Sequence, residues 1–198
     1  MKETVIEMIR HGEPVGGSRY RGHGIDDPLS EKGWRQMWES VGEHSGWSRI
    51  ISSPLTRCAA FANELGKNRQ LPVTIHDDLK EIGFGAWEGK TKAQLREERL
   101  EEFDAFYRDP VANTPENAEK VMNFHARIGT VFEHLRERYQ GEQLLVVAHA
   151  GVIRAMITYA VGAPADCMYR LTITNGGISR LRLAPQGVLL DKLNGTAG

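Results

Sequence analysis

Apolar residues form several short continuous runs along the chain, each long enough for one buried β-strand and each ended by polar residues or glycine. The strongest runs cover residues 4–9, 47–52 and 144–148, and a weaker one covers residues 73–76. Continuous apolar runs are typical of strands that are buried on both faces, as in a parallel sheet. We therefore expect a sheet that lies between two other layers.

Between these runs, apolar residues recur at the three- and four-residue spacing of helices. Ser30 is the predicted N-cap of the first helix, over residues 30–44, and Ser53 followed by Pro54 predicts the start of the second, over residues 53–65. Further helices are predicted over residues 92–107, 118–139 and 151–161. Strands that alternate with helices in this way predict an α/β fold.

The C-terminal part has a different pattern, in which short strands follow one another without a helix between them. The predicted strands cover residues 170–174, 178–183 and 188–193, the first two joined through residues 175–177. We expect this end of the sheet to be antiparallel. The predicted fold is an α/β three-layer sandwich with a mostly parallel central sheet, helices on both faces and a single domain over residues 1–198, with a small helical insertion at about 90–116.

The composition of the chain argues against several classes of protein. The 198 residues include 25 Lys and Arg against 26 Asp and Glu, so the net charge of -1 gives no general attraction to nucleic acid. No apolar run reaches 18 residues and the first residues carry no apolar signal segment, so we expect neither a membrane-spanning nor a secreted protein. Cys58 and Cys167 lie far apart without a CxxC pair, which fits ordinary thiols in a reducing, cytoplasmic setting.

Three predicted junctions between a strand and the segment after it carry basic side chains. Arg10 and His11 follow the first strand, Arg57 lies just after the second, and His149 follows the strand over residues 144–148. Ligands of open α/β sheets bind beyond the carboxyl ends of the strands, so these side chains can meet in one pocket. Two junctions also lead into helix N-termini, which favour anions. The sequence therefore predicts a phosphate pocket.

A neutral imidazole in such a pocket can attack phosphorus, provided that fixed cations spread the charge on the phosphoryl oxygens. We assign this nucleophilic role to His11, and no metal or cofactor is then required. A proton must also reach the leaving oxygen. Glu81, in the glycine-rich segment over residues 79–89, is the main candidate for this proton donor, with Glu13 and Glu88 as alternatives.

Other residues near these junctions are candidates for contacts with the substrate. Ser53 is expected mainly to cap its helix, although its hydroxyl can also face phosphate. Gly151 offers a backbone N–H at the start of the helix after His149. Arg21 and His23 lie in the glycine-rich loop over residues 13–27, where substrate contact and solvent exposure are equally good interpretations.

Taken together and in order, these segments resemble the histidine phosphatase superfamily, which includes the cofactor-dependent phosphoglycerate mutases. The resemblance rests on residues 9–13 (IRHGE), 27–30 (DPLS), 52–57 (SSPLTR), 79–89 (LKEIGFGAWEG) and 146–154 (VVAHAGVIR). It implies that His11 is the phosphorylated nucleophile, that Arg10, Arg57 and His149 complete the phosphate pocket, and that Glu81 donates the proton. The assignment from the residues alone agrees with it.

Within the superfamily, the chain resembles the phosphatase branch that contains α-ribazole phosphatase of cobalamin biosynthesis. The mutases carry Arg-His-Tyr-Gly directly after the acidic residue, where this chain has residues 82–85 (IGFG), and this difference favours water as the phosphoryl acceptor. Two other segments differ from the sequences that are common in the family, residues 16–21 (GGSRYR) and residues 115–119 (PENAE), and we expect both to reshape the substrate contacts.

The resulting hypothesis is a phosphatase that hydrolyses a small phosphate monoester, with α-ribazole 5′-phosphate as the candidate substrate. The alternatives are a phosphoglycerate mutase, which shares the pocket and differs in the acceptor, and a non-catalytic phosphate-binding module. A metal-dependent hydrolase is disfavoured because no HExxH or clustered ligand set is present. The expected partners are a small phosphorylated metabolite and, as one option, a second copy of the chain in a homodimer, with no nucleic acid and no membrane.

Overall fold

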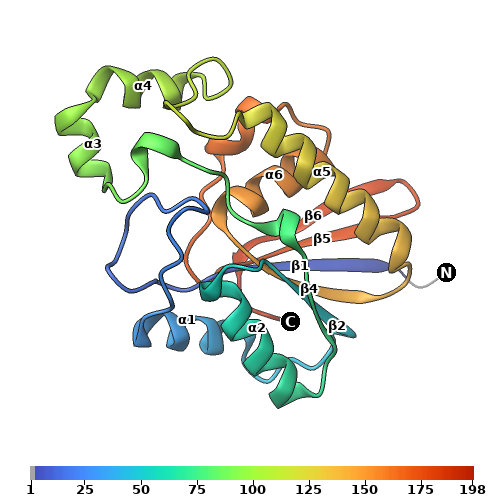
Figure 1. Ribbon diagram of the computed structural model, residues 1–198. Coiled ribbons are helices and arrows are strands. Elements are labelled where there is room, and N and C mark those ends of the chain that lie inside the picture. The colour runs from blue at the N-terminus through green and yellow to red at the C-terminus, as the bar shows by residue number, and fades with distance from the viewer. Residues whose placement is uncertain (1–2) are drawn as a thin grey trace.

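A computed structural model describes residues 3–198 and contains one six-stranded sheet in the order β3-β2-β4-β1-β5-β6 (Figure 1). The strands are β1 (Thr4–Arg10), β2 (Arg49–Ser52), β3 (Val73–Ile75), β4 (Gln143–Ala148), β5 (Ile178–Ala184) and β6 (Gly187–Gly195). The pairs β3-β2, β2-β4 and β4-β1 are parallel, whereas β5 pairs antiparallel with both β1 and β6. The predicted mostly parallel sheet with an antiparallel C-terminal end is confirmed.

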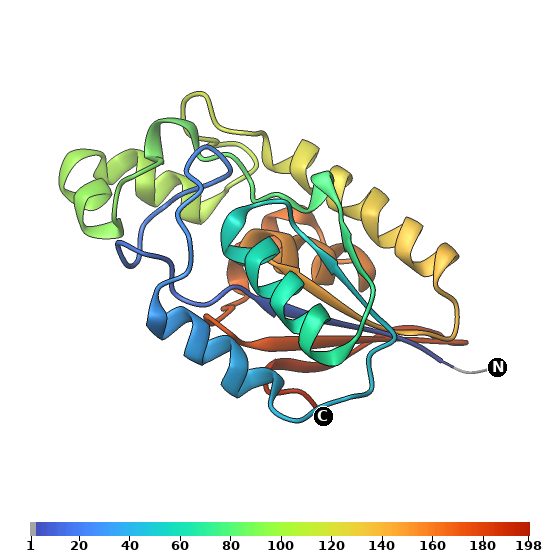
Figure 2. The same cartoon turned by 60° about the horizontal axis from the view of Figure 1, so that its bottom comes forward.

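Helices cover both faces of this sheet, as Figures 1 and 2 show from two directions. One face carries α1 (Glu31–Val41) and α2 (Thr56–Arg69), and the other carries α5 (Val121–Arg138) and α6 (Ala150–Ala160). Short 3-10 turns, η1 (Asp77–Leu79), η2 (Gly85–Trp87) and η3 (Ala165–Arg170), lie in the connections. The predicted α/β three-layer sandwich is therefore confirmed. No helix within residues 3–198 is long and apolar enough to span a membrane.

The strand β4 shows why its sequence is apolar at every position. Leu144, Val146 and Ala148 pack toward α5 and α6, while Leu145 and Val147 pack toward α1 and α2. Successive side chains of a strand point to opposite faces, so in a strand that is buried on both faces every side chain lies in a hydrophobic layer. The continuous run in the sequence follows directly from this double burial.

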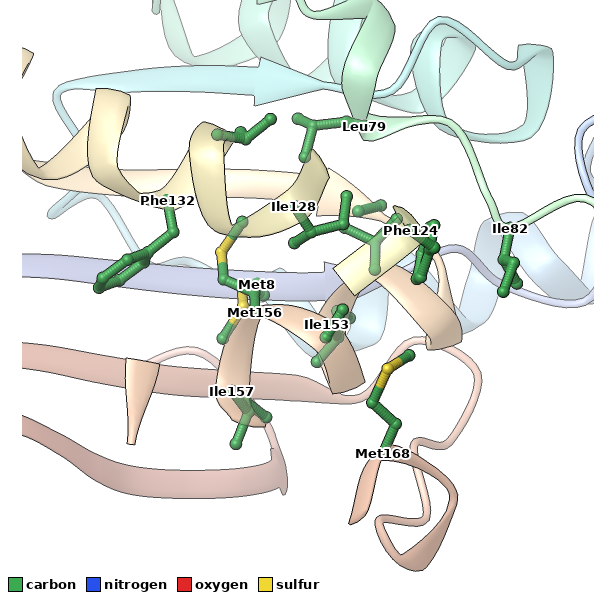
Figure 3. Packing of buried hydrophobic residues seen from close by; sticks show 14 of the residues in the cluster. Met8, Leu79, Ile82, Phe124, Ile128, Phe132, Ile153, Met156, Ile157 and Met168 are labelled. Carbon is green, nitrogen blue, oxygen red and sulfur yellow. The ribbon is translucent and has the colours of Figure 1, made fainter. Parts of the chain in front are cut away.

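The layer between the sheet and α5 and α6 holds the larger of the two hydrophobic clusters. Figure 3 shows side chains from β1, α5 and α6 meeting in this layer, among them Met8, Ile128 and Met156. All three are fully buried. The packing fixes α6, and thereby the junction between β4 and α6, against the sheet.

One charged side chain lies inside the sheet. Glu7 of β1 is 1% exposed, and its carboxylate accepts a hydrogen bond from Trp47 Nε1 at 2.7 Å and is paired with Arg180 of β5 at 2.7 Å. A buried charge is tolerated only when it is paired and hydrogen-bonded. These partners therefore make Glu7 a fixed point of contact between β1, β5 and the segment before β2.

The strand predicted over residues 170–174 is wrong. Arg170 is the last residue of η3, and residues 171–174 have no ladder partner, because their carbonyl groups accept hydrogen bonds from side chains: Leu171 from Arg154 Nε at 2.8 Å and Ile173 from Arg10 at 2.7 Å. The C-terminal hairpin instead joins β5 to β6. Residues 171–175 therefore form a wall beside the ends of the strands.

The single helix predicted over residues 92–107 is divided into α3 (Lys92–Glu98) and α4 (Leu100–Arg108). The break falls at Arg99, whose backbone is not helical (φ -146°, ψ 44°). Thr91 and Gln94 form a capping box at the start of α3. Figure 1 shows both helices apart from the two main helical layers, beyond the carboxyl ends of the strands. Their description as an insertion into one domain stays a prediction.

Candidate active site

The three predicted junctions lie side by side, because β2, β4 and β1 are neighbouring parallel strands whose carboxyl ends meet at one edge. A cavity of about 660 Å³ opens at this edge. Among the residues that line it are Arg10, His11, Arg21, Arg57, Glu81 and Gly151. The structure thus brings together six of the residues that the sequence selected.

His11 lies at the end of β1 with only 6% of its surface exposed. Its Nδ1–H donates a hydrogen bond to the Gly12 carbonyl at 2.7 Å. A carbonyl can only accept, so the proton of the neutral ring sits on Nδ1 and the lone pair on Nε2. Burial, followed by the charges of Arg10 and Arg57, holds the pKa of His11 well below its usual value. The imidazole is therefore neutral and its Nε2 is available as a nucleophile.

His149 lies beside His11, with the two rings edge to face and their centroids 5.2 Å apart. It is fully buried, and its Nε2 shares a hydrogen bond of 2.7 Å with Ser53 Oγ. Burial and the neighbouring Arg57 hold the pKa of His149 well below its usual value. Two neutral imidazoles therefore stand together at the end of the sheet.

The predicted capping role of Ser53 is wrong. The helix α2 begins at Thr56, three residues later, and the Ser53 hydroxyl bonds to His149 at 2.7 Å and accepts from the Leu55 N–H, which lies outside the helix, at 3.3 Å. The cap comes from the loop instead, since the Asp26 carboxylate accepts from both the backbone N–H and the hydroxyl of Thr56 at 2.7 Å. Asp26 was not singled out from the sequence, because nothing local in the chain connects it to this helix.

Arg10 and Arg57 flank His11, and backbone carbonyl groups hold both side chains in place. Arg57 is 1% exposed and donates to Gly22 at 2.8 Å, whereas Arg10 donates to Ile173 at 2.7 Å. The Nε atoms of both arginines are buried without an acceptor among the described residues. Burial lowers the pKa of Arg10 to about 10, so this guanidinium stays charged near neutral pH. Cations with buried, unused donor atoms form a ready site for an anion.

Arg21 adds a third guanidinium from the loop over residues 13–27. It is 6% exposed and donates through Nε to Asp27 at 2.8 Å and through a terminal nitrogen to the Val15 carbonyl at 2.7 Å. These bonds fold the loop over the cavity. His23 lies elsewhere: it is exposed, it donates through Nδ1 to the Glu81 carbonyl at 2.9 Å, and it is absent from the described lining of the cavity.

Glu81 faces the same cavity and is 9% exposed. Its two carboxylate oxygens accept from the backbone N–H groups of Ile82 at 3.0 Å and Gly151 at 3.1 Å. A Cβ at Gly151 would lie 2.2 Å from Glu81 Oε1, so only glycine lets the carboxylate approach the start of α6. The N–H of Gly151, which the sequence analysis assigned to the substrate, is thus used by Glu81 in this structure.

The alternative proton donors are placed differently. Glu13 lies at the rim, where its carboxylate pairs with Lys32 at 3.0 Å. Glu88 accepts from the Phe84 N–H at 3.0 Å, and among the described residues it is not part of the cavity wall. Of the three acidic candidates, Glu81 is the one that is both buried and directed at the cavity.

Comparison with known proteins agrees with this geometry. A family model of the histidine phosphatase superfamily (branch 1) matches residues 6–196. The chain belongs to this superfamily. Arg10, His11, Arg57, Glu81 and His149 of this histidine phosphatase fall within the matched range.

Three relatives illustrate the range of the family. The chain is 29% identical over 194 residues to the adenosylcobalamin/α-ribazole phosphatase of Escherichia coli, covering 96% of this chain and 95% of that protein. It is 31% identical over 180 residues to a bifunctional protein of Mycobacterium tuberculosis, of which it spans 49%, so it covers about half the length of that relative. The solved structure of a mycobacterial glucosyl-3-phosphoglycerate phosphatase matches with a TM-score of 0.87 at 25% identity, covering 98% of this chain and all of that one (100%).

The cavity of this histidine phosphatase also holds residues that the sequence did not select individually, although Arg19 and Tyr20 belong to residues 16–21 and Phe84 to residues 79–89. Its further basic residues are Arg19, Lys92 and Arg154, and its aromatic residues are Tyr20, Phe84, Tyr107 and Tyr169. Burial lowers the pKa of Lys92, and the nearby charge of Arg154 adds to this effect. Tyr20 and Tyr107 share a hydrogen bond of 2.6 Å, which joins the first loop to α4. These residues come from separate loops and helices, and no local motif connects them.

Two further observations concern ligands. Within residues 3–198, no group of three or more His, Cys, Asp or Glu side chains is arranged to hold a metal ion. Residues 17–21 of the first departing segment contribute to the cavity wall, as expected for a segment that reshapes substrate contacts, whereas none of residues 115–119, all described, lies in that wall. Residues 115–119, the second segment that differs from the family's common sequence, therefore have a different role.

Proposed function

We propose that this histidine phosphatase hydrolyses small phosphate monoesters through a phosphohistidine intermediate on His11. The observation that carries the proposal is the hydrogen bond from His11 Nδ1–H to the Gly12 carbonyl at 2.7 Å. It leaves the Nε2 lone pair on a neutral imidazole within a cavity that is lined by two buried arginines, Arg21 and Arg57, and by the half-buried Arg10. A nucleophile with this tautomer beside fixed cations is suited to phosphoryl transfer.

In the first step, the substrate phosphate binds between the guanidinium groups of Arg10, Arg21 and Arg57. The Nε2 atom of His11 forms a bond to phosphorus while the bond from phosphorus to the ester oxygen breaks. The arginines spread the charge of the three equatorial oxygens, which is the main catalytic requirement of this reaction. Glu81 in its protonated form gives a proton to the departing oxygen, which leaves as an alcohol.

In the second step, water attacks the phosphohistidine. The Glu81 carboxylate now accepts a proton from the water as the new bond to phosphorus forms, and the bond from phosphorus to Nε2 breaks. The His149 ring, which its hydrogen bond to Ser53 fixes in place, packs edge to face against His11 behind the described cavity wall. Inorganic phosphate and the neutral imidazole of His11 are restored.

A histidine nucleophile also fits a mutase, in which a hydroxyl of the substrate replaces water as the acceptor. Residues 82–85 (IGFG) differ from the Arg-His-Tyr-Gly of the mutases, and this difference supports the phosphatase. Phosphate release and phosphoryl transfer, measured on one preparation with a phosphoglycerate, decide between the two. A mutase would isomerise the substrate faster than it releases phosphate.

For the substrate, we propose a small phosphorylated metabolite, with α-ribazole 5′-phosphate as the first candidate. The Escherichia coli relative supports this choice by its name, and the cavity of about 660 Å³ has room for an organic group as well as the phosphate. Phe84, Tyr107 and Tyr169 provide apolar surface for such a group. A phosphate-release screen that includes α-ribazole 5′-phosphate, phosphoglycerates and sugar phosphates tests the choice.

The nucleophile is tested with His11→Ala and with His134→Ala as its control, because His134 is an exposed histidine on α5. We expect the first variant to lose at least about a thousand-fold in kcat, as removal of a covalent nucleophile does, and the second to match the wild type. Enzyme quenched in alkaline denaturant should carry a phosphate on His11 that is stable to base and lost in acid. Retention of wild-type turnover by His11→Ala would refute the assignment, and phosphate binding without release by the wild type across the whole screen would favour a binding module.

A further inference from the structure

Glu81 lies in a segment without regular secondary structure, between η1 and η2. A proton donor must nevertheless stay within hydrogen-bond reach of the leaving oxygen, so its backbone needs support from elsewhere. Arg127 of α5 and Glu119, which is located before the same helix, provide contacts on both sides of Glu81.

Arg127 holds the backbone on the N-terminal side. One terminal nitrogen donates to the carbonyl groups of Asp78 and of Lys80, the latter at 3.2 Å. The Lys80 carbonyl belongs to the peptide bond between Lys80 and Glu81. This contact therefore restrains the backbone directly before the proposed donor. The guanidinium also stands over the Phe124 ring at 4.9 Å, which orients its plane.

Glu119 holds the C-terminal side. Its backbone N–H donates to the Gly83 carbonyl at 2.9 Å, and its carboxylate accepts from the Gly83 N–H at 3.4 Å. The same carboxylate receives two donors from Arg127, Nε at 3.1 Å and a terminal nitrogen at 2.8 Å. This bidentate ion pair links the two contacts into one unit.

The location of the pair argues against a role in binding the substrate. Both side chains are half-buried, 16% and 21% exposed, and neither is among the described residues of the cavity wall. Their polar atoms are directed at the backbone of residues 78–83. They therefore contact the reaction site through residues 78–83, of which only Glu81 is among the described residues of the cavity wall.

We infer that Arg127 and Glu119 are positioning residues, which hold the Glu81 carboxylate at the distance needed to protonate the leaving group. This inference rests on the proposed function, in which Glu81 is the proton donor. It also gives residues 115–119 a role: this segment crosses the Glu81 segment rather than reaching the substrate.

The test uses the dependence of kcat/KM on the leaving group, measured with a series of aryl phosphates from p-nitrophenyl phosphate to phenyl phosphate and with an alkyl phosphate. A nitrophenolate leaves without help, whereas an alkoxide needs a proton, so loss of the donor is selective for poor leaving groups. Glu81→Gln is the reference. We expect Arg127→Met to lower kcat/KM for phenyl phosphate and the alkyl phosphate about ten-fold or more beyond its effect on p-nitrophenyl phosphate, as for a donor displaced by part of an ångström.

Arg136→Met is the matched control. Arg136 lies on the same helix as Arg127, on an exposed surface, and is far from residues 78–83 in the sequence. Its side chain pairs with Glu133 at 2.8 Å, so the variant also removes an arginine from an ion pair. Its ratio of kcat/KM values should equal that of the wild type. Glu119→Gln keeps the shape of the side chain and weakens the ion pair, so it gives a second measurement if Arg127→Met folds poorly, and it should shift the ratio in the same direction.

In the background of Glu81→Gln, Arg127→Met should cause no further selective loss. An equal fall for all leaving groups in both Arg127→Met and Glu119→Gln would overturn the inference, because a merely structural role lowers every rate alike. If instead Glu81→Gln itself shows no selectivity, the donor assigned in the proposed function is wrong. The two failures are thus distinguishable within one experiment.

Discussion

The two buried imidazoles predict a specific dependence of stability on pH. In the unfolded chain a histidine takes up its proton near pH 6.5. In the folded protein, burial holds the pKa values of His11 and His149 well below that value. As the pH falls below about 6.5, the unfolded state therefore binds more protons than the folded state, and folding is opposed. Above about pH 6.5 both histidines are neutral in both states and do not lower the free energy of unfolding. Below that pH the free energy of unfolding decreases as the pH falls toward the folded pKa values.

The magnitude follows from the number of protons involved. Each histidine that is neutral when folded and protonated when unfolded lowers the free energy of unfolding by about 1.4 kcal/mol per pH unit. Two such residues give a combined slope of about 2.7 kcal/mol per pH unit. Replacing His11 with glutamine removes one titrating ring, so the slope of the variant should be smaller than that of the wild type by up to about 1.4 kcal/mol per pH unit.

Urea denaturation of both proteins at half-unit steps from pH 7.5 to pH 5 measures this difference. Carboxylates and His125, whose pKa is also lowered by burial, contribute to both proteins and cancel in the comparison. Parallel curves for the wild type and His11→Gln would refute the reasoning, because His11 would then carry the same proton in both states. A wild type that becomes more stable on acidification would contradict it as well.

Three further predictions follow from individual contacts. Ser53→Ala should cost about 1–3 kcal/mol, since it removes the partner of the buried His149 ring; unchanged stability in urea would argue against the importance of this bond. Gly12→Ala places a Cβ 2.1 Å from the carbonyl oxygen of Gly33, and overpacking against backbone should cost about 3 kcal/mol or more, lowering Tm by roughly 6–12 °C in a thermal scan. The basic residues of the cavity, which outnumber its described acidic ones, should make kcat/KM for a phosphate dianion fall as salt rises; a flat salt profile would show that the field of the cavity does not guide the substrate.

Much of the fold and the core of the site could be predicted because they depend on local patterns. A strand buried on both faces must be apolar throughout, and it can carry a reactive side chain only where it ends. This constraint made His11 and His149 visible as polar residues directly after apolar runs. Because parallel strands end at one edge of a sheet, the two residues could also be expected to meet.

Other features could not be predicted, because long-range contacts determine them. Residues 170–174 alternate like a strand, yet side chains of Arg10 and Arg154 take up the carbonyl groups that a ladder would use. Ser53 precedes proline at a helix start, which is the usual setting of a cap, but the buried His149 competes for its hydroxyl. In both cases the partner lies far away in the chain.

The pairing of β1 with β4 has a consequence for how the protein reaches its active form. Val5 is paired with Gln143, so the two histidines come together only after most of the chain has been made and this non-local contact has closed. Contacts of such long sequence separation form slowly, because loop closure must precede any gain from packing. A nascent or truncated chain that lacks β4 holds His11 without His149, so the proposed site cannot be complete until β4 has paired with β1.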